Sequence, residues 1–173
     1  MTSKTALLVI DVQRVYMEPE PMVTSDGDDL VAKCKSLIDK AHVAGIPVLF
    51  VQHVSEDQPD DPDLVAVHPG LEPESGTATI QKTFNSAFLQ TDLEGTLADL
   101  GVESLTVCGL ATFGCVNATV LCALCKGYDV TVVKDAHGAR DFPDALAGEV
   151  IERFHRTWER AGARLVRQED AVF

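Results

Sequence analysis

The sequence has few basic residues for its number of acidic ones. Fourteen lysines and arginines accompany 27 aspartates and glutamates, so the formal net charge is −13 at pH 7. A surface this acidic repels the phosphate backbone of nucleic acids and the headgroups of anionic membranes. We therefore expect neither a nucleic acid nor a membrane as a partner.

Long hydrophobic runs and a disulfide framework are also missing. The apolar run "TALLVI" at 5–10 is far too short for the hydrophobic region of a signal peptide or for a membrane span. The five cysteines are odd in number and do not form the paired pattern of small secreted proteins. These absences lead us to expect a cytoplasmic protein with free thiols.

Short apolar segments predict the strands of a buried sheet. The chain of 173 residues, 46% hydrophobic, suits a single domain over 1–173 with a sizeable core. Nearly continuous apolar runs are typical of strands covered on both faces, and four occur: "TALLVID", "GIPVLFVQH", "ESLTVCG" and "YDVTVVKDA". A weaker strand, "TATIQK", and a last one, "ARLV", bring the number to six.

Segments of helical length lie between these strands. They cover 28–44, 91–100, 115–126 and 143–161, and a glycine closely follows each of them, as at many helix ends. Alternation of strands and helices with short links predicts a parallel sheet between helix layers. The fold class expected is therefore α/β, with three layers and a doubly wound, mainly parallel sheet of six strands, similar to a Rossmann fold.

One loop interrupts this rhythm. From Val54 to Gly76 the sequence has little periodicity and contains several prolines and acidic residues. Long loops of this kind often act as active-site lids or binding loops. A surface excursion or a subunit contact fits the pattern equally well.

Polar residues follow several of the predicted strands. In open α/β sheets, ligands bind outside the carboxyl ends of the strands. The residues at those ends are Asp11, Gln13 and Tyr16, then Gln52 and His53, then Lys82, then the segment 109–115, and finally Asp135 and His137. We therefore expect an acid, a base and a thiol to meet at one edge of the sheet.

Four of the cysteines fit a packing role. Cys108 lies within an apolar strand and Cys34 on the first predicted helix. Cys122 and Cys125 form a C-x-x-C pair well inside a helical segment, whereas redox pairs stand at a helix N-terminus. No second pair completes a zinc site, so packing of this pair against the sheet is the expected role.

Cys115 has a different context. It follows a strand and a short loop with two glycines, and it opens a predicted helix. Backbone N–H groups at a helix start lower the pKa of a thiol and hold an oxyanion. Asp11 would serve as its general base and Lys82 would favour the thiolate, although a loop-capping acid and an ordinary surface lysine are alternatives for these two.

Three motifs resemble those of a known family. "ALLVIDVQ", "QKTFNSAF" and "VCGLATFGCVNAT", the last followed by "GYDVTVVKDAHGA", are similar in order and spacing to the isochorismatase-like cysteine hydrolase superfamily, which includes nicotinamidase-related amidohydrolases. The resemblance covers essentially the whole chain and implies an isochorismatase-type fold. It also implies a catalytic triad of Asp11, Lys82 and Cys115.

The resemblance implies a reaction as well. The peptide bond between Leu110 and Ala111 would be cis, and the N–H groups of Ala111 and Cys115 would form the oxyanion hole. Asp11 would take the thiol proton, and Cys115 would attack the carbonyl carbon of a small-molecule amide. Water would then hydrolyse the thioester, without a cofactor.

Aromatic residues near the motifs are candidate walls of the substrate pocket. The pocket residues expected are Tyr16, His53, Phe84 and Phe113. For Tyr16 and Phe84 a place in the core or a subunit interface also fits, and His53 fits equally well as a strand-end residue hydrogen-bonded to the loop.

Nicotinamidases in this superfamily carry a metal site made of an aspartate and two histidines. His53, Asp57 and His68 occur in the corresponding region, but the compact spacing of that site is absent, so we expect no metal.

Two other functions remain open at this point. One is vinyl-ether hydrolysis of an isochorismate-like acid, for which Arg14 and Arg140 are the available arginines. The other is a reactive-thiol protein that binds a ligand or senses oxidation without hydrolysis. The resemblance also implies a homodimer or homotetramer.

Overall fold

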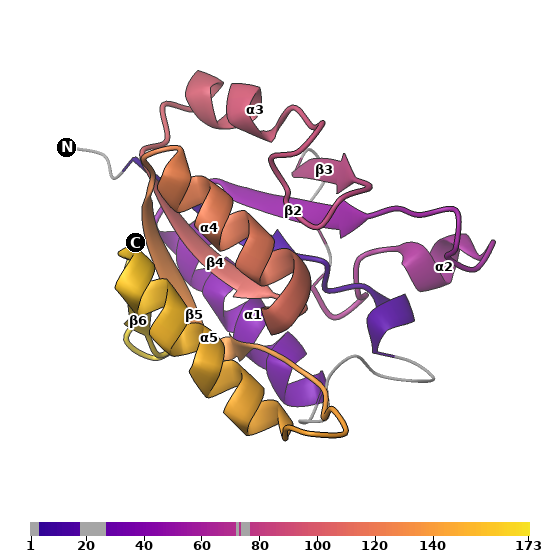
Figure 1. Ribbon diagram of the computed structural model, residues 1–173. Coiled ribbons are helices and arrows are strands. Elements are labelled where there is room, and N and C mark those ends of the chain that lie inside the picture. Colours follow the sequence, from indigo (N-terminus) through magenta and orange to yellow (C-terminus); the bar gives the residue numbers. More distant parts are fainter. Residues whose placement is uncertain (1–3, 18–26, 72, 74–76) are drawn as a thin grey trace.

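The sheet is the centre of the molecule. The structure is a computed structural model that describes residues 4–17, 27–71, 73 and 77–173 (Figure 1). Six strands lie in the order β3-β2-β1-β4-β5-β6, and all five pairings between them are parallel. The strands are β1 Thr5–Ile10, β2 Val48–His53, β3 Ala78–Lys82, β4 Ser104–Gly109, β5 Asp129–His137 and β6 Arg164–Val166. The predicted α/β class and six-stranded sheet are confirmed.

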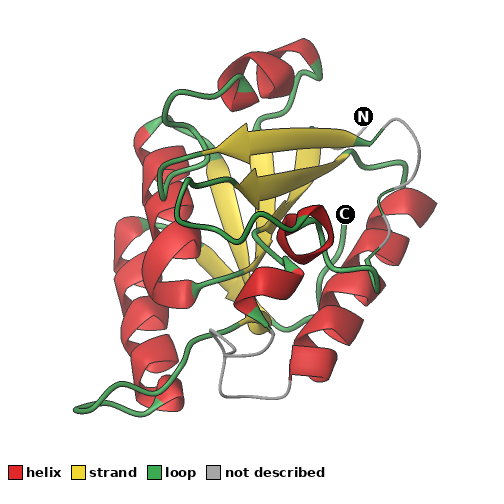
Figure 2. Cartoon of the chain, turned by 90° about the vertical axis from the view of Figure 1, so that its right-hand side faces the viewer, coloured by secondary structure: helices red, strands yellow, loops and turns green. Residues whose placement is uncertain are grey.

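Helices cover both faces of this sheet (Figure 2). They are α1 Gly27–Val43, α2 Pro62–Val65, α3 Leu93–Asp99, α4 Asn117–Cys125 and α5 Ala147–Ala161, with a short turn η1 at Arg14–Tyr16 and a wide π-type turn η2 at Thr112–Val116. Among the described residues, no helix is long and apolar enough to cross a membrane.

Alternate residues of β1 explain why its sequence is apolar throughout. Leu7 and Val9 belong to the core cluster that includes the buried face of α1. Leu8 and Ile10 belong to the opposite cluster, which includes buried residues of α3 and α4 and Trp158 of α5. Since both faces of the strand are buried, both sets of side chains are hydrophobic.

The boundaries of the long helices differ from the prediction by up to four residues. The last long helix begins at Ala147 rather than at residue 143, because Phe142 and Ala145 pair in an isolated bridge and Asp141 Oδ1 accepts the N–H of Ala147 at 2.7 Å. The helix expected from residue 115 begins at Asn117 instead. Cys115 lies in the η2 turn before it, which is kinked at Gly114.

The long loop after β2 is partly ordered by local structure. The side chain of Asp61 caps the short helix α2, and Val67 forms a bridge with Gln13. Residues 72 and 74–76 of the segment from Val54 to Gly76 lie outside the described residues. The described part of this loop therefore packs against the carboxyl end of β1.

The strand order reverses between β1 and β4, and the candidate site lies at the carboxyl ends of these two strands. The chain winds from β1 to β2 and β3, then crosses back to β4 on the other side of β1. Gly109 at the end of β4 has φ +117°, and a Cβ there would lie 2.0 Å from the Ile10 carbonyl oxygen. Only glycine allows this close approach, which brings residues 110–115 beside Asp11.

Candidate active site

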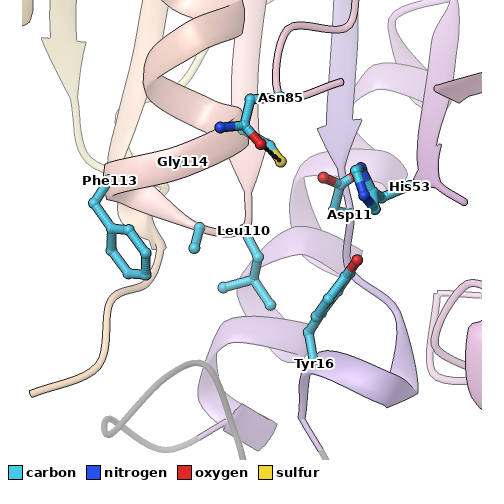
Figure 3. Close-up of a pocket in the computed structure, with 9 residues that line it drawn as sticks. Asp11, Tyr16, His53, Asn85, Leu110, Phe113 and Gly114 are labelled. Atoms are coloured by element: carbon cyan, nitrogen blue, oxygen red, sulfur yellow. Dashed lines mark hydrogen bonds between the residues drawn. The ribbon is translucent and has the colours of Figure 1, made fainter. Parts of the chain in front are cut away.

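A cavity of about 280 Å³ opens at the carboxyl ends of β1 and β4. Figure 3 shows Tyr16 and Leu110 at its lower part and Asn85 near the sulfur atom. The residues that line it are Asp11, Tyr16, His53, Asn85, Leu110, Ala111, Phe113, Gly114 and Cys115. This position is the one that ligands occupy in open α/β sheets.

Lys82 lies beneath the cavity and joins its polar groups. Its side chain is fully buried, so the alternative of a surface lysine is wrong. The ammonium nitrogen Nζ is 2.7 Å from Asp11 Oδ2, 3.0 Å from His53 Nδ1 and 3.2 Å from Cys115 Sγ. The contacts with His53 and Cys115 are hydrogen bonds, and the contact with Asp11 is an ion pair.

Asp11 is a buried carboxylate, 2% exposed, in a left-handed backbone conformation with φ 50°. Its contact with Lys82 is an ion pair without aligned hydrogen-bond geometry, and neither carboxylate oxygen has a hydrogen-bond partner among the described residues. Burial raises the pKa of this carboxyl group, while Lys82 and the Cys115 thiol act in the opposite direction. A carboxylate with a raised pKa is a better proton acceptor.

The Cys115 thiol is not activated in the way we expected. Burial, followed by the charge of Asp11, raises its pKa to about 12, and the opposing effect of Lys82 is smaller. The expectation of a lowered thiol pKa is therefore wrong, because a helix start does not reveal how far the sulfur is buried. The resting thiol holds its proton, and Asp11 is the carboxylate in the cavity lining that can remove it.

His53 contributes a neutral imidazole. Burial, and then the charge of Lys82, lowers the pKa of its side chain. An ammonium only donates, so Nδ1 accepts from Lys82 and Nε2 carries the ring proton. The backbone of His53 exchanges two hydrogen bonds with the Gln13 side chain, at 2.8 and 3.0 Å, and its carbonyl also accepts from Gln58 at 3.1 Å. His53 therefore combines the two roles considered for it: it lines the cavity, and its backbone is hydrogen-bonded to the loop after β2.

Three groups in the site have the chemistry of metal ligands. One ligand atom each from Asp11, His53 and Cys115 lies within 4.8 Å of the others. The Lys82 ammonium contacts all three residues, so a divalent cation placed among them would meet a buried positive charge. His68 Nδ1 accepts the N–H of Gly70 at 3.1 Å and is thereby engaged in a turn. These residues fit Lys82 better than they fit a metal.

The segment between β4 and α4 supplies backbone donors. The peptide bond between Leu110 and Ala111 is cis. No described residue accepts a hydrogen bond from the Ala111 N–H, and both Ala111 and Cys115 line the cavity. Backbone N–H groups at such a place can bind a developing oxyanion.

The remaining predicted pocket residues divide into two groups. Tyr16 and Phe113 line the cavity, with the Tyr16 hydroxyl bonded to Gln58 at 3.0 Å and the Phe113 ring packed edge-on against Phe142. Phe84 differs from expectation: it lies outside the lining and is 41% exposed. Its neighbour Asn85 faces the site instead, with Oδ1 3.8 Å from Cys115 Sγ.

Other residues from the sequence argument have structural roles. Asp135 Oδ1 accepts the N–H of Gln168 at 2.8 Å, and His137 is buried behind the site. Neither Arg14 nor Arg140 lines the cavity. Cys125 is exposed, so packing against the sheet is wrong for this cysteine, whereas Cys122 packs on the core. Asn85 was missed, although it stands in the quoted motif "QKTFNSAF".

Comparison with known proteins gives the class to which this site belongs. The family model of the isochorismatase domain matches residues 5–156. The chain therefore belongs to the isochorismatase family, as its motifs indicated.

Named relatives include hydrolases. An uncharacterized isochorismatase family protein of Bacillus subtilis, YddQ, is 34% identical over 137 residues, 76% of each chain. Streptothricin hydrolase of Streptomyces noursei is 35% identical over 144 residues, which are 81% of this chain but 56% of that protein. Maleamate amidohydrolase of Pseudomonas putida is 26% identical over 178 residues, 87% of this chain and 84% of that one. This chain thus spans little more than half of streptothricin hydrolase.

The fold agrees with this assignment. The crystal structure of an isochorismatase from Pseudomonas putida KT2440 matches with a TM-score of 0.89 at 29% identity, over 99% of this chain and 91% of that one.

Proposed function

We propose that this isochorismatase-family protein is a cysteine hydrolase that cleaves the C–N bond of a small neutral carboxamide through a thioester. The observation that carries the proposal is the buried Lys82 ammonium, which contacts both the Cys115 thiol and the Asp11 carboxylate at one cavity. A nucleophile and a base that contact the same cation form a complete set for acyl transfer. The relative named maleamate amidohydrolase supports an amide as the bond type.

The first half-reaction forms the acyl-enzyme. Asp11 takes the proton of the Cys115 thiol, and Lys82, 3.2 Å from the sulfur, stabilises the thiolate. The sulfur attacks the carbonyl carbon, and the carbonyl oxygen becomes an oxyanion that the Ala111 and Cys115 N–H groups bind. Collapse of this intermediate breaks the C–N bond, and protonated Asp11 gives its proton to the leaving amine or ammonia.

The second half-reaction releases the acid. Asp11 takes a proton from water, and the hydroxide attacks the thioester carbonyl. The C–S bond breaks, the carboxylic acid leaves, and the thiolate recovers its proton from Asp11. Atoms and protons balance over the cycle: amide and water give acid and amine.

The cavity favours a small substrate without a negative charge. Its volume is about 280 Å³, and Leu110, Ala111 and Phe113 contribute apolar surface. The described residues that line it include no arginine or lysine, and Lys82 beneath them already contacts Asp11, His53 and Cys115. An isochorismate-like acid would need a cation for its carboxylate, so vinyl-ether hydrolysis is the less suitable reaction.

A ligand-binding thiol protein is also a less suitable interpretation. Burying an ammonium and a carboxylate costs several kcal/mol per ion before their attraction is counted. A binding pocket for a neutral ligand has no need of that arrangement. An acyl-transfer site needs both charges, because one removes the thiol proton and the other stabilises the thiolate.

Ammonia release from a panel of small carboxamides tests the proposal. The panel contains neutral aliphatic and aromatic amides, and the products are followed together with the mass of the protein. We expect at least one amide to be hydrolysed and to leave an acyl group on Cys115 during turnover. Cys115→Ala should lower the rate at least about 10³-fold.

The matched control is Cys125→Ser, which changes an exposed cysteine on α4. It should keep full activity. Turnover that survives in Cys115→Ala, or reversible oxidation of Cys115 with no amide hydrolysed, would contradict the proposal and favour the thiol-protein interpretation.

A further inference from the structure

Buried hydrogen bonds join Thr112, His137 and His155 behind the Cys115 turn, and the exposed Glu152 lies next to His155 at their outer end. Thr112 Oγ1 lies 2.8 Å from His137 Nδ1, His137 Nε2 lies 2.9 Å from His155 Nε2, and His155 Nδ1 lies 3.3 Å from Glu152 Oε1. Thr112 is fully buried, and His137 and His155 are 5% and 7% exposed. These side chains do not line the cavity, and the proposed reaction does not use them directly.

Chemistry fixes the proton positions at the inner end of this row of hydrogen bonds. The Thr112 hydroxyl donates to the Gly138 carbonyl oxygen at 2.8 Å, since a carbonyl only accepts. His137 Nδ1 must therefore donate to that hydroxyl, and its Nε2 lone pair accepts the Nε2 proton of His155. Burial, followed by the charge of His155, lowers the pKa of His137 to about 3, which agrees with a neutral ring.

Neighbouring rings hold His137 in one orientation. The Trp158 ring meets it edge-on at 5.1 Å and 79°, and the His155 ring at 5.0 Å and 88°. Trp158 is itself fully buried, and its Nε1–H donates to Asn117 Oδ1 at 3.0 Å at the start of α4. Rotation of the His137 ring is therefore blocked on two sides, and its Nδ1 proton stays directed at Thr112.

Thr112 in turn fixes the turn that carries the oxyanion donors. It directly follows Ala111, and its N–H donates to Gly138 O at 2.9 Å, so three hydrogen bonds fasten residue 112 near the end of β5. We infer that His137, held in one tautomer by His155, is a positioning residue that fixes Thr112 and thereby directs the Ala111 N–H toward the oxyanion. This inference rests on the proposed function.

Two reactions of Cys115 distinguish a substitution that weakens binding of the oxyanion from one that changes the reactivity of the thiolate. p-Nitrophenyl acetate acylates the sulfur: the S–C bond forms, the bond to p-nitrophenolate breaks, and a tetrahedral oxyanion lies between. Iodoacetamide alkylates the same sulfur by displacing iodide from a saturated carbon, without an oxyanion. Mass spectrometry assigns both adducts to Cys115, and the ratio of the two rate constants is the readout.

Variants at both ends of the inner hydrogen bond should change this ratio. In Thr112→Val and in His137→Leu we expect acylation to slow about 10-fold or more while alkylation stays within about twofold. In His137→Asn an amide N–H lies near the position of Nδ1, so acylation should return to within about threefold of the original rate. Thr157→Val, at an exposed position of α5, is the matched control and should keep both rates.

Several outcomes would overturn the inference: equal loss of both rates, unchanged acylation, or a His137→Asn variant no better than His137→Leu. Should His137→Leu fail to fold, Thr112→Val carries the test, because it is nearly isosteric and removes the same hydrogen bond. If unmodified protein is alkylated but never acylated at Cys115, the proposed function itself fails, and this inference fails with it.

Discussion

The single ammonium group of Lys82 organises the candidate site. It contacts a carboxylate, a neutral imidazole and a thiol, and these are the ligand types that bind a metal ion elsewhere. A lysine at this place supplies a positive charge that cannot dissociate from the chain. Burial lowers the pKa of His53, and the Lys82 charge lowers it further, whereas the same charge favours the ionised form of Asp11.

The charges of Asp11 and Lys82 should shift the pKa of Cys115 in opposite directions. Burial has the largest effect and raises this pKa, Asp11 raises it further, and Lys82 lowers it. Asp11→Asn should therefore lower the thiol pKa, so that alkylation of Cys115 by iodoacetamide at about pH 8 is faster than in the unmodified protein. Lys82→Met should raise the pKa and slow alkylation. Site-resolved mass spectrometry over a pH series measures both.

In these variants the rate of amide turnover should not change in parallel with the rate of Cys115 alkylation. Asp11→Asn loses the base and is expected to lose turnover even though its thiolate is more abundant. The exposed Cys125 in the same samples is the internal control, and its alkylation should be equal in all three proteins. Shifts of Cys115 in the same direction in both variants would contradict this account of the thiol.

At the scale of elements, the contact between β1 and β4 positions the site. Gly109→Ala would place a Cβ 2.0 Å from the Ile10 carbonyl oxygen at φ +117°. We expect it to lower the free energy of unfolding by about 3 kcal/mol or more. Gly101→Ala is the matched control, because its φ is +65° with no atom within 4 Å, and it should cost only about 1 kcal/mol. Urea unfolding compares the two, and equal losses would contradict the argument.

The elements of the sheet could be predicted well from the sequence. Strands covered on both faces are largely apolar, and the residues at the carboxyl ends of β1, β2 and β3 are polar, so Asp11, His53 and Lys82 could be placed at one edge. The contact between His53 and Lys82 could not be predicted. It depends on the register that aligns His53 with Lys82, and a long aperiodic loop separates β2 from β3.

The sequence also did not reveal how deeply the Cys115 sulfur is buried. The motif around Cys115 indicates a turn after a strand, but the raised thiol pKa depends on how deeply the sulfur lies beside Asp11. The histidine chain behind Thr112 was missed for a similar reason. His155 lies on α5, and only the packing of that helix on the sheet brings it to His137.

At the scale of the whole molecule, net charge and cavity lining act together on substrate choice. The chain has a formal charge of −13, and the lining residues that the structure describes include Asp11 but no lysine or arginine. The field of the molecule and the local site therefore both disfavour an anion. A homodimer or homotetramer stays a prediction, and a partner subunit that added a cation to the cavity would change this balance.

For any carboxamide that the protein hydrolyses, an analogue with an added carboxylate should therefore be a poorer substrate. We expect kcat/KM for the anionic analogue to be at least about tenfold lower at low salt. Because salt screens the repulsion between exposed charges, the difference should narrow as ionic strength rises from about 0.01 to 0.15 M, while the neutral amide keeps its rate. Steady-state kinetics on such a pair measures this. A preference for the anion that weakens with salt would instead show that a cation outside the described lining contributes to the site.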